Sequence, residues 1–395
     1  MNCLLRTLLG KSLRLVLLCL LVILSPVIAV CQDTFWDQLT TAERISKSPW
    51  WPTKPSQPTD RFTGTASCAE CHADIVKSQS KAEMSQTLIP AEKSSLAGFD
   101  GKSITVDGFV YKFIKTGNSL SYDLMASKTT AAEPLEWAFG SGAISQAYLT
   151  SKGTWYNESH FSYFKEIDAL DVTPAQPKIR ELVGAKSADS AEVKSAEGRH
   201  VTADEARRCF SCHAANVPAK ESLEKMIPGV TCEACHGPGG NHIAAVKAGI
   251  AQGAGLAFNS GHLRPVDRVD FCGACHGTSL DILTEGSSGL ASVRFPAYRL
   301  QNSKCWRDDA RIQCTSCHDP HQPLSHDAAT YDARCLSCHA SRGAKQDEAH
   351  VGRACPTAVK DCVSCHMPKY EFPEVHHKFT DHQIRVVRPG EAMPS

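Results

Sequence analysis

The sequence predicts a mostly α-helical chain with extensive irregular loops, together with a smaller N-terminal module that contains β-structure. Residues 103–125 alternate apolar and polar side chains around a Thr-Gly-Asn turn, which is typical of a β-hairpin. The aromatic segment 147–164 indicates further strands. Beyond residue 200, a short cysteine and histidine motif recurs at intervals of about 16 to 37 residues. Such intervals suit short helices and loops rather than separate domains.

Residues 1–29 have the features of a secretory signal peptide. Basic side chains precede an unbroken apolar run from Leu15 to Leu24, and Pro26 and the small Ala29 follow it. We expect cleavage after Ala29 and export to the periplasm or cell surface. An uncleaved anchor is the weaker alternative, because the apolar run is shorter than the ~20 residues of a spanning helix. A lipid on Cys31 is a further alternative.

The overall composition excludes some classes of partner and points to the cysteines. The chain has 42 basic and 42 acidic side chains and no basic stripe interleaved with aromatic residues, so we expect no nucleic-acid partner. It has no P-loop or dinucleotide-binding glycine pattern. Its 19 cysteines exceed what a reducing compartment usually keeps, unless the thiols hold a metal or cofactor.

Fourteen of the 19 cysteines belong to seven copies of the pattern C-x-x-C-H. The copies, numbered one to seven in chain order, are Cys68/Cys71/His72, Cys209/Cys212/His213, Cys232/Cys235/His236, Cys272/Cys275/His276, Cys314/Cys317/His318, Cys335/Cys338/His339 and Cys362/Cys365/His366. Two thiols at this spacing can form thioether bonds to one haem, and the adjacent histidine reaches its iron. Zinc would need two cysteine pairs per ion, and disulfides have no use for the histidine. The sequence therefore predicts seven covalently attached haem c groups with these histidines as proximal ligands.

Histidines outside the motifs are candidates for the distal iron position. The predicted distal ligands are His160, His200, His242, His262, His321, His377 and His382, and the other histidines are His326, His350 and His376. His242 follows the glycine turn of "CHGPGGNH", and His321 ends "CHDPH". No histidine follows the first motif until His160, so Met84 is predicted to offer that iron a thioether. A core methionine is the alternative reading of Met84.

The motifs and the composition together suggest how the chain is organised. The predicted parts are a signal peptide at 1–29, an extended leader at 30–60, a one-haem module with β-hairpins at 61–184, a linker or exposed loop at 185–200 and a six-haem module at 201–395. The two cysteines left over after the first motif, Cys305 and Cys355, are predicted to form a disulfide, because export exposes them to an oxidising compartment.

Several motif segments resemble a known superfamily. The segments "GVTCEACHGPGGNH", "FCGACHG", "CTSCHDPH", "CLSCH" and "DCVSCHMPK" followed by "FTDH" are similar to those of multihaem cytochromes c related to the tetrahaem cytochrome c-554 and hydroxylamine oxidoreductase group. The resemblance covers about residues 205–385 and implies closely packed haem pairs, largely bis-histidine ligation and exported redox work. The C-x-x-C-K motif of the pentahaem nitrite reductases in this superfamily is absent, so their activity does not carry over.

We therefore expect an exported cytochrome that carries electrons along closely packed haems between redox partner proteins of unidentified kind. This interpretation favours a carrier over a catalyst, and we assign no catalytic residue. The alternative is a multihaem oxidoreductase that acts on a small nitrogen or sulfur compound at one haem with an open distal position. Membrane contact would require a retained or lipidated signal segment, and the oligomeric state stays open.

Overall fold

The computed structural model describes residues 50–52, 61–125, 132–179, 190–218, 223, 226–250, 257–306, 312–339, 355–388 and 390–394. The predicted signal peptide at 1–29 lies outside these residues, as do most of the predicted leader at 30–60 and positions 185–189 of the predicted linker. The chain divides into two compact units, Met1–Trp51 and Pro52–Ser395, and every element named below belongs to the second. Within the described ranges, no helix is long and apolar enough to cross a membrane.

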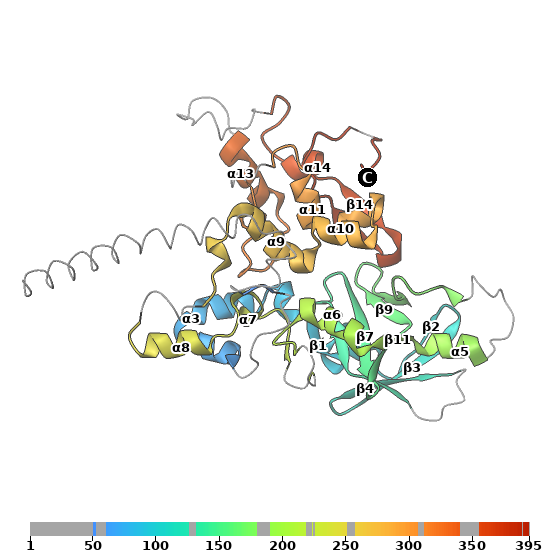
Figure 1. Cartoon of the computed structure of the whole chain (residues 1–395). Coiled ribbons are helices and arrows are strands. Elements are labelled where there is room, and N and C mark those ends of the chain that lie inside the picture. Colours follow the sequence, from blue (N-terminus) through green and yellow to red (C-terminus); the bar gives the residue numbers. More distant parts are fainter. Residues whose placement is uncertain are drawn as a thin grey trace, which may run out of the picture. The chain divides into compact units, whose positions relative to one another are not determined.

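Strands dominate the chain up to about residue 202, and helices dominate after it (Figure 1). The strands are β1 (Leu88–Pro90), β2 (Ser103–Val106), β3 (Phe109–Thr116), β4 (Ser119–Leu124), β5 (Glu133–Leu135), β6 (Trp137–Phe139), β7 (Ser145–Ser151), β8 (Trp155–Glu158), β9 (Phe161–Phe164), β10 (Ala169–Val172), β11 (Arg199–Thr202), β12 (Ala214–Ala215), β13 (Ile227–Pro228), β14 (Lys369–Phe372) and β15 (His377–Thr380). The α-helices are α3 (Thr65–Gln79), α5 (Ser190–Glu197), α6 (Ala203–His213), α7 (Cys232–His236), α8 (Gly240–Lys247), α9 (Pro265–His276), α10 (Ser279–Glu285), α11 (Pro296–Gln301), α12 (Cys314–Cys317), α13 (Ala328–His339) and α14 (Cys362–His366). Short 3-10 helices are η2 (Glu83–Gln86), η3 (Ala91–Lys93), η4 (Ser95–Phe99), η6 (Ser260–His262), η7 (Gly289–Arg294) and η8 (Pro373–Val375).

The predicted β-hairpin at 103–125 is confirmed and is part of a four-stranded antiparallel sheet in the order β2-β3-β4-β5. Thr116 pairs with Ser119 across the turn, so that Gly117 and Asn118 form its two-residue loop. Gly117 has a φ of 59°, in the left-handed region that glycine adopts without a steric cost.

The strands predicted within 147–164 are also confirmed, as β7, β8 and β9. They belong to a seven-stranded sheet with the path β1-β6-β7-β8-β11, in which β9 pairs with β7 and β10 pairs with β9. The aromatic and β-branched side chains of these segments suit a pleated, buried surface. The β-structure is thus more extensive than the small module that the sequence predicts.

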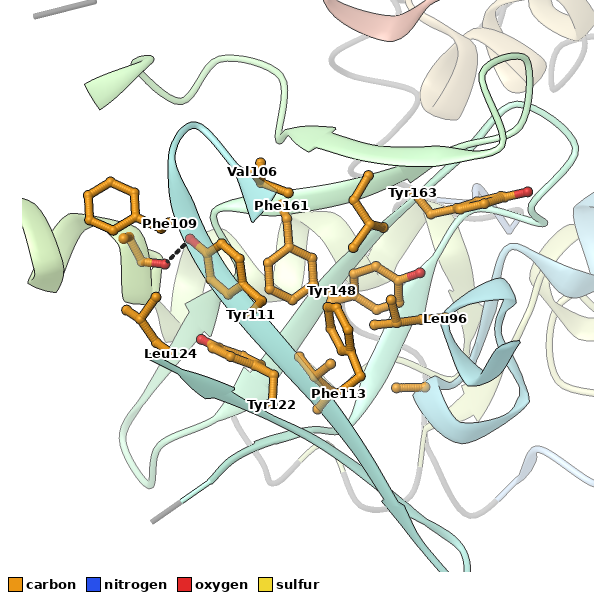
Figure 2. Close-up of a cluster of buried hydrophobic side chains, with 14 of the residues drawn as sticks. Leu96, Val106, Phe109, Tyr111, Phe113, Tyr122, Leu124, Tyr148, Phe161 and Tyr163 are labelled. Carbon is orange, nitrogen blue, oxygen red and sulfur yellow. Dashed lines mark hydrogen bonds between the residues drawn. The ribbon is translucent and has the colours of Figure 1, made fainter. Parts of the chain in front are cut away.

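An aromatic core lies between these strands (Figure 2). Phe161 is fully buried, and its ring makes edge contacts with those of Tyr111, Phe113 and Tyr122 at centroid distances of 4.9, 5.3 and 5.2 Å. Such pairs stabilise a core beyond the burial of their area. This half of the molecule therefore has an ordinary apolar core made by the polypeptide alone.

Residues 190–202, which include the described part of the predicted linker or exposed loop at 185–200, have regular secondary structure. They form α5 and β11, and β11 pairs antiparallel with β8. The hydroxyls of Tyr111 and Tyr122 donate hydrogen bonds to the carbonyls of Ala196 and Glu197, each at 2.7 Å. Buried tyrosine hydroxyls need such partners. The small, polar composition of the segment did not indicate that its carbonyls accept hydrogen bonds from the core.

Helix α6 is joined to the sheet through Phe210. This ring is buried and lies 5.0 Å from the ring centre of Phe139 and 6.3 Å from that of Trp137. A capping box between Thr202 and Glu205 starts the helix directly after β11. The second C-x-x-C-H motif, at the end of α6, is therefore held by the sheet.

The predicted fold class is confirmed only in part. After α6 the described chain consists mainly of short helices and irregular segments, as expected for a motif-dense half. Before α6, two sheets replace the small module with hairpins. A "mostly α" description therefore fits the C-terminal half and underestimates the strands of the N-terminal half.

The aromatic core makes a first prediction about stability. Phe161→Ala should lower the free energy of unfolding by about 3–5 kcal/mol, because it removes a fully buried ring with four aromatic neighbours. Denaturant titration followed by far-ultraviolet circular dichroism measures the change. Ile167→Ala is the matched control: its side chain is exposed, and the expected change is within about 0.5 kcal/mol. Equal effects of the two substitutions would contradict this description of the core.

Candidate haem-binding sites

Every C-x-x-C-H motif lies on a helix, and in most of them the histidine comes where the helix ends. Helices α6, α7, α9, α13 and α14 each finish at the motif histidine, and His318 directly follows α12. In α3 the helix continues, but His72 departs from helical geometry with φ −117° and ψ 40°. Cysteines three residues apart on a helix lie on one face. The motifs therefore present two thiols together and a histidine beside them.

None of the fourteen motif thiols is fully enclosed by the described protein groups. Cys71, Cys209, Cys275 and Cys365 are exposed, and the other ten motif cysteines are partly buried. The hydroxyls of Ser337 and Ser364 lie 3.9 Å from the Sγ atoms of Cys338 and Cys365, their neighbours in sequence. The assignment of the motif cysteines to haem attachment stays a prediction from the motif spacing.

Three motif histidines are oriented by backbone carbonyls. The Nδ1 atoms of His213, His236 and His366 donate hydrogen bonds to the carbonyl oxygens of Thr87, Phe258 and Arg385, at 3.0, 2.7 and 2.9 Å. Histidines that ligate a metal usually donate their second ring N–H in this way, which fixes the tautomer and leaves Nε2 as the ligating atom. These contacts fit histidines that hold a haem iron.

The structure also brings His236 of the third motif together with His321. Their ring centres are 6.1 Å apart and their planes differ by 7°. Two metal–imidazole bonds of about 2 Å, together with the distance from each nitrogen to its ring centre, would separate two axial imidazoles by roughly 6 Å. The Nδ1 atom of His321 lies 3.5 Å from a carboxylate oxygen of Asp319, and that of His236 is bound to Phe258. This arrangement supports His321 as the distal ligand at the third motif.

A second pair joins His318 of the fifth motif with His382. Their ring centres are 6.3 Å apart, again close to the separation of two axial imidazoles, and their planes differ by 43°. The Nδ1 atom of His382 donates to the carbonyl of Thr380 at 3.1 Å. Burial, followed by the proximity of His318, lowers the pKa of His382 to about 4. The imidazole is therefore neutral at physiological pH, which is the form that binds a metal.

His160 is not placed as a distal ligand, contrary to the prediction. It is buried in the β-structured half, where Nδ1 lies 3.2 Å from the side-chain oxygen of Gln176 and Nε2 lies 3.3 Å from a carboxylate oxygen of Asp107. Because both ring nitrogens have protein partners, neither is available to an iron. His160 is a hydrogen-bonded core histidine.

The other predicted distal ligands have varied surroundings. The exposed ring of His200 stacks on Trp155 at 4.6 Å, and Nδ1 of His377 lies 3.3 Å from Glu166. His262 is exposed at the end of η6. His242 lies in α8, and its Nδ1 is buried without a hydrogen-bond partner in the described chain. His242 therefore has a buried polar atom without a partner, whereas the ring of His200 contacts Trp155 and that of His377 contacts Glu166.

Met84, the predicted thioether ligand, does not share a helix with the first motif. Helix α3 ends at Gln79, and Met84 lies in the separate 3-10 helix η2. Its backbone carbonyl accepts a hydrogen bond from the amide of Val230 at 3.0 Å. The thioether ligand stays a prediction, now from a residue that the backbone anchors close to the third motif.

Helices that carry different motifs lie against each other. Contacts join α3 with α7, α6 with α9, α9 with α12, α12 with α13, and α13 with α14. In the numbering of the motifs, the first adjoins the third, the second adjoins the fourth, and the fourth to the seventh follow one another. The order in space therefore differs from the order in sequence only at the start of the chain.

Buried carboxylates make two of these contacts, and the sequence analysis did not single them out. Glu233, between the cysteines of the third motif, accepts hydrogen bonds from the amides of Thr63 and Gly64 before α3, at 2.9 and 2.8 Å. Asp332 of α13 accepts from the amides of Asp361 and Cys362 at the start of α14, at 2.7 and 2.8 Å. In the sequence, the position of Glu233 inside the third motif and of Asp332 one turn before the sixth was the signal that could have identified these carboxylates.

The predicted disulfide between Cys305 and Cys355 is wrong for this structure, in which no disulfide joins them. Cys355 is exposed, with its thiol close to the backbone amides of Thr357 and Ala358. Cys305 is partly buried and lies near Cys317 of the fifth motif. An even number of leftover cysteines does not show where they lie in space.

Comparison with known proteins adds to these observations. Residues 153–237 match the family model described as cytochrome c554 and c-prime. This relates the chain to the multihaem c-type cytochromes. The matched segment contains the second and third motifs, on α6 and α7, and it agrees with the resemblance read from the sequence.

The solved structure of the outer cell wall cytochrome OcwA is similar over 83% of this chain and 80% of that chain, with a TM-score of 0.48 and 14% sequence identity. No curated protein sequence matches this chain.

The pairing of His236 with His321 makes a second prediction. His321→Ala should open one distal position, so that the reduced protein binds one more carbon monoxide per chain than the unchanged protein. The Soret difference spectrum under carbon monoxide measures this. His326→Ala, at an exposed histidine of the same loop, is the control and should bind no additional carbon monoxide. If His321→Ala also binds none, His321 is not the ligand.

A third prediction concerns Met84. If its thioether is the distal ligand at the first motif, Met84→Ala should remove a near-infrared methionine-to-iron band and lower the potential of one haem. Redox titration with optical detection measures both changes. His242→Ala is the informative comparison, because its buried Nδ1 makes it the alternative ligand. An unchanged spectrum in Met84→Ala would make Met84 a packing residue.

Proposed function

We propose that this protein is an exported c-type cytochrome that holds seven haems and passes electrons along them between redox partner proteins. The haem groups, when bound, supply the one-electron redox chemistry. The observation that carries the proposal is the unbroken contact between motif helices from α6 through α9, α12 and α13 to α14. Short distances between successive attachment sites favour fast electron transfer.

The polypeptide contributes attachment, orientation and shielding. Paired thiols on each helix would fix the position of a haem covalently, and carbonyl contacts such as that of Thr87 hold the ligating imidazoles in one tautomer. The pairs His236/His321 and His318/His382 support bis-histidine ligation at two motifs. An iron with two protein ligands has no position for a substrate, which favours a carrier over a catalyst.

Contacts between the thiols of different motifs support the same order of sites. The thiols of Cys212 and Cys275 lie close enough to perturb each other's pKa, as do those of Cys335 and Cys362, and Sγ of Cys212 lies 3.8 Å from the carbonyl of Ala274. The thiols of the second and fourth motifs and of the sixth and seventh motifs are therefore neighbours. We infer that haems attached there would be close enough to exchange electrons directly.

Export is the part of the proposal that rests on the N-terminus. The basic residues and the apolar run of residues 1–29 are typical of a secretory signal. Multihaem c-type cytochromes, to which the matched family model relates the chain, work outside the cytoplasm. We propose the periplasm or the cell surface as the location, with a one-haem part at 61–184 and a six-haem part at 201–395.

The decisive experiment is intact mass spectrometry of the exported protein in denaturant. The expected mass exceeds that of the processed polypeptide by seven haems, because seven complete attachment motifs lie beyond the signal segment. Five haems or fewer would rule the proposal out. Carbon monoxide added to the reduced protein tests the carrier assignment: a fully six-coordinate carrier stays unchanged, whereas stoichiometric binding by the unaltered protein would favour the oxidoreductase.

A further inference from the structure

A buried carboxylate lies between two arginines near the C-terminus. Asp381 is inaccessible to solvent and accepts hydrogen bonds from Nε and Nη2 of Arg299, at 2.8 and 2.9 Å. Nη1 of Arg385 donates to the same carboxylate at 2.6 Å, and the amide of Gln383 does so at 3.0 Å. Charged groups so fully buried need partners of this quality, and removal of one partner leaves an uncompensated charge.

The carboxylate of Asp381 is the buried negative charge of this cluster. Burial alone would raise the pKa of Asp381, but hydrogen bonds from Arg299, Gln383 and Arg385 outweigh it and hold the pKa below its ordinary value. The carboxylate is therefore ionised. Arg299 also donates to the carbonyl of Pro394, and Arg385 donates to the hydroxyl of Tyr370. Nε of Arg385 also lies 3.9 Å from a carboxylate oxygen of the more exposed Glu391, so two guanidinium groups face two carboxylates, of which only that of Asp381 is fully buried.

The cluster is part of the segment that serves two haem sites. His382 follows Asp381 directly and faces His318 of the fifth motif. The carbonyl of Arg385 accepts the Nδ1–H hydrogen bond of His366, the motif histidine of the seventh site. The short segment from His382 to Arg385 is also held by Ser303, whose hydroxyl donates to the carbonyl of His382 at 3.0 Å and accepts from the amide of Ile384 at 2.8 Å.

The geometry points to Asp381 as a positioning residue for two haems at once. We infer that it holds His382 toward the fifth motif and, through Arg385, His366 at the seventh, and that the charges of Asp381 and Arg385 shift the potentials of these two haems in opposite directions. A fixed positive charge near an iron stabilises the reduced form, which carries one positive charge fewer. The inference rests on the proposed function because it requires haems at these motifs.

The test compares variants that remove a negative charge with variants that remove a positive charge, because the two should shift the haem potentials in opposite directions. Asp381→Asn removes the negative charge, so the midpoint potentials of two haems should rise in a redox titration. Arg385→Gln removes a positive charge, so the potentials of the same haems should fall. Arg385→Lys keeps the charge and should restore potentials close to those of the unchanged protein. A potential shift caused only by lost packing would not have opposite signs in Asp381→Asn and Arg385→Gln.

Controls separate this inference from the function on which it depends. Asp204→Asn removes an exposed carboxylate of α6 and should leave every potential unchanged. Intact mass establishes that each variant retains its haems. If Asp381→Asn does not fold, the comparison of Arg385→Gln with Arg385→Lys still decides the matter. Seven haems with no potential shift in any variant would overturn the role of Asp381 alone, whereas missing haems in the unchanged protein would overturn the proposed function.

Discussion

Covalent attachment of a haem requires two thiols one helical turn apart and an imidazole beside them, and this local geometry constrains the rest of the fold. Six of the seven motif histidines end or directly follow a helix, and three of these helices are very short: α7 and α14 have five residues each and α12 has four. Helices of this length are not stable by themselves. Their stability must come from neighbouring segments, and buried carboxylates such as Glu233 and Asp332 provide part of it.

The N-terminal and C-terminal halves of the molecule differ in the size and composition of their apolar cores. In the N-terminal half, aromatic side chains around Phe161 pack between strands as in an ordinary globular protein. In the C-terminal half, the largest described apolar cluster is small and centres on Val269, Ala297 and Leu300. Polar contacts and closely spaced attachment motifs take the place of a larger apolar core there, which is consistent with a chain that encloses bulky cofactors.

Much of the fold was predictable where the signal is local. Alternating side chains predicted the hairpin at 103–125, which the structure contains, whereas the attachment sites stay a prediction from the C-x-x-C-H spacing. Long-range contacts were not predictable in this way: α5 resembles a linker until Tyr111 and Tyr122 bind its carbonyls. The same limit applies to ligands, because His160 and His321 are both lone histidines in the sequence. Only their three-dimensional neighbours separate a core residue from a ligand.

The contact between the first and third motifs has a consequence for the way in which the chain matures. Glu233 binds the amide of Thr63 across 170 residues of sequence. As the polypeptide emerges from its N-terminus, α3 cannot dock until this distant segment is available, and closing so long a loop slows folding. The segment that carries the first C-x-x-C-H motif therefore stays without this partner until the chain beyond residue 233 has been made, although it is the first motif to be synthesised.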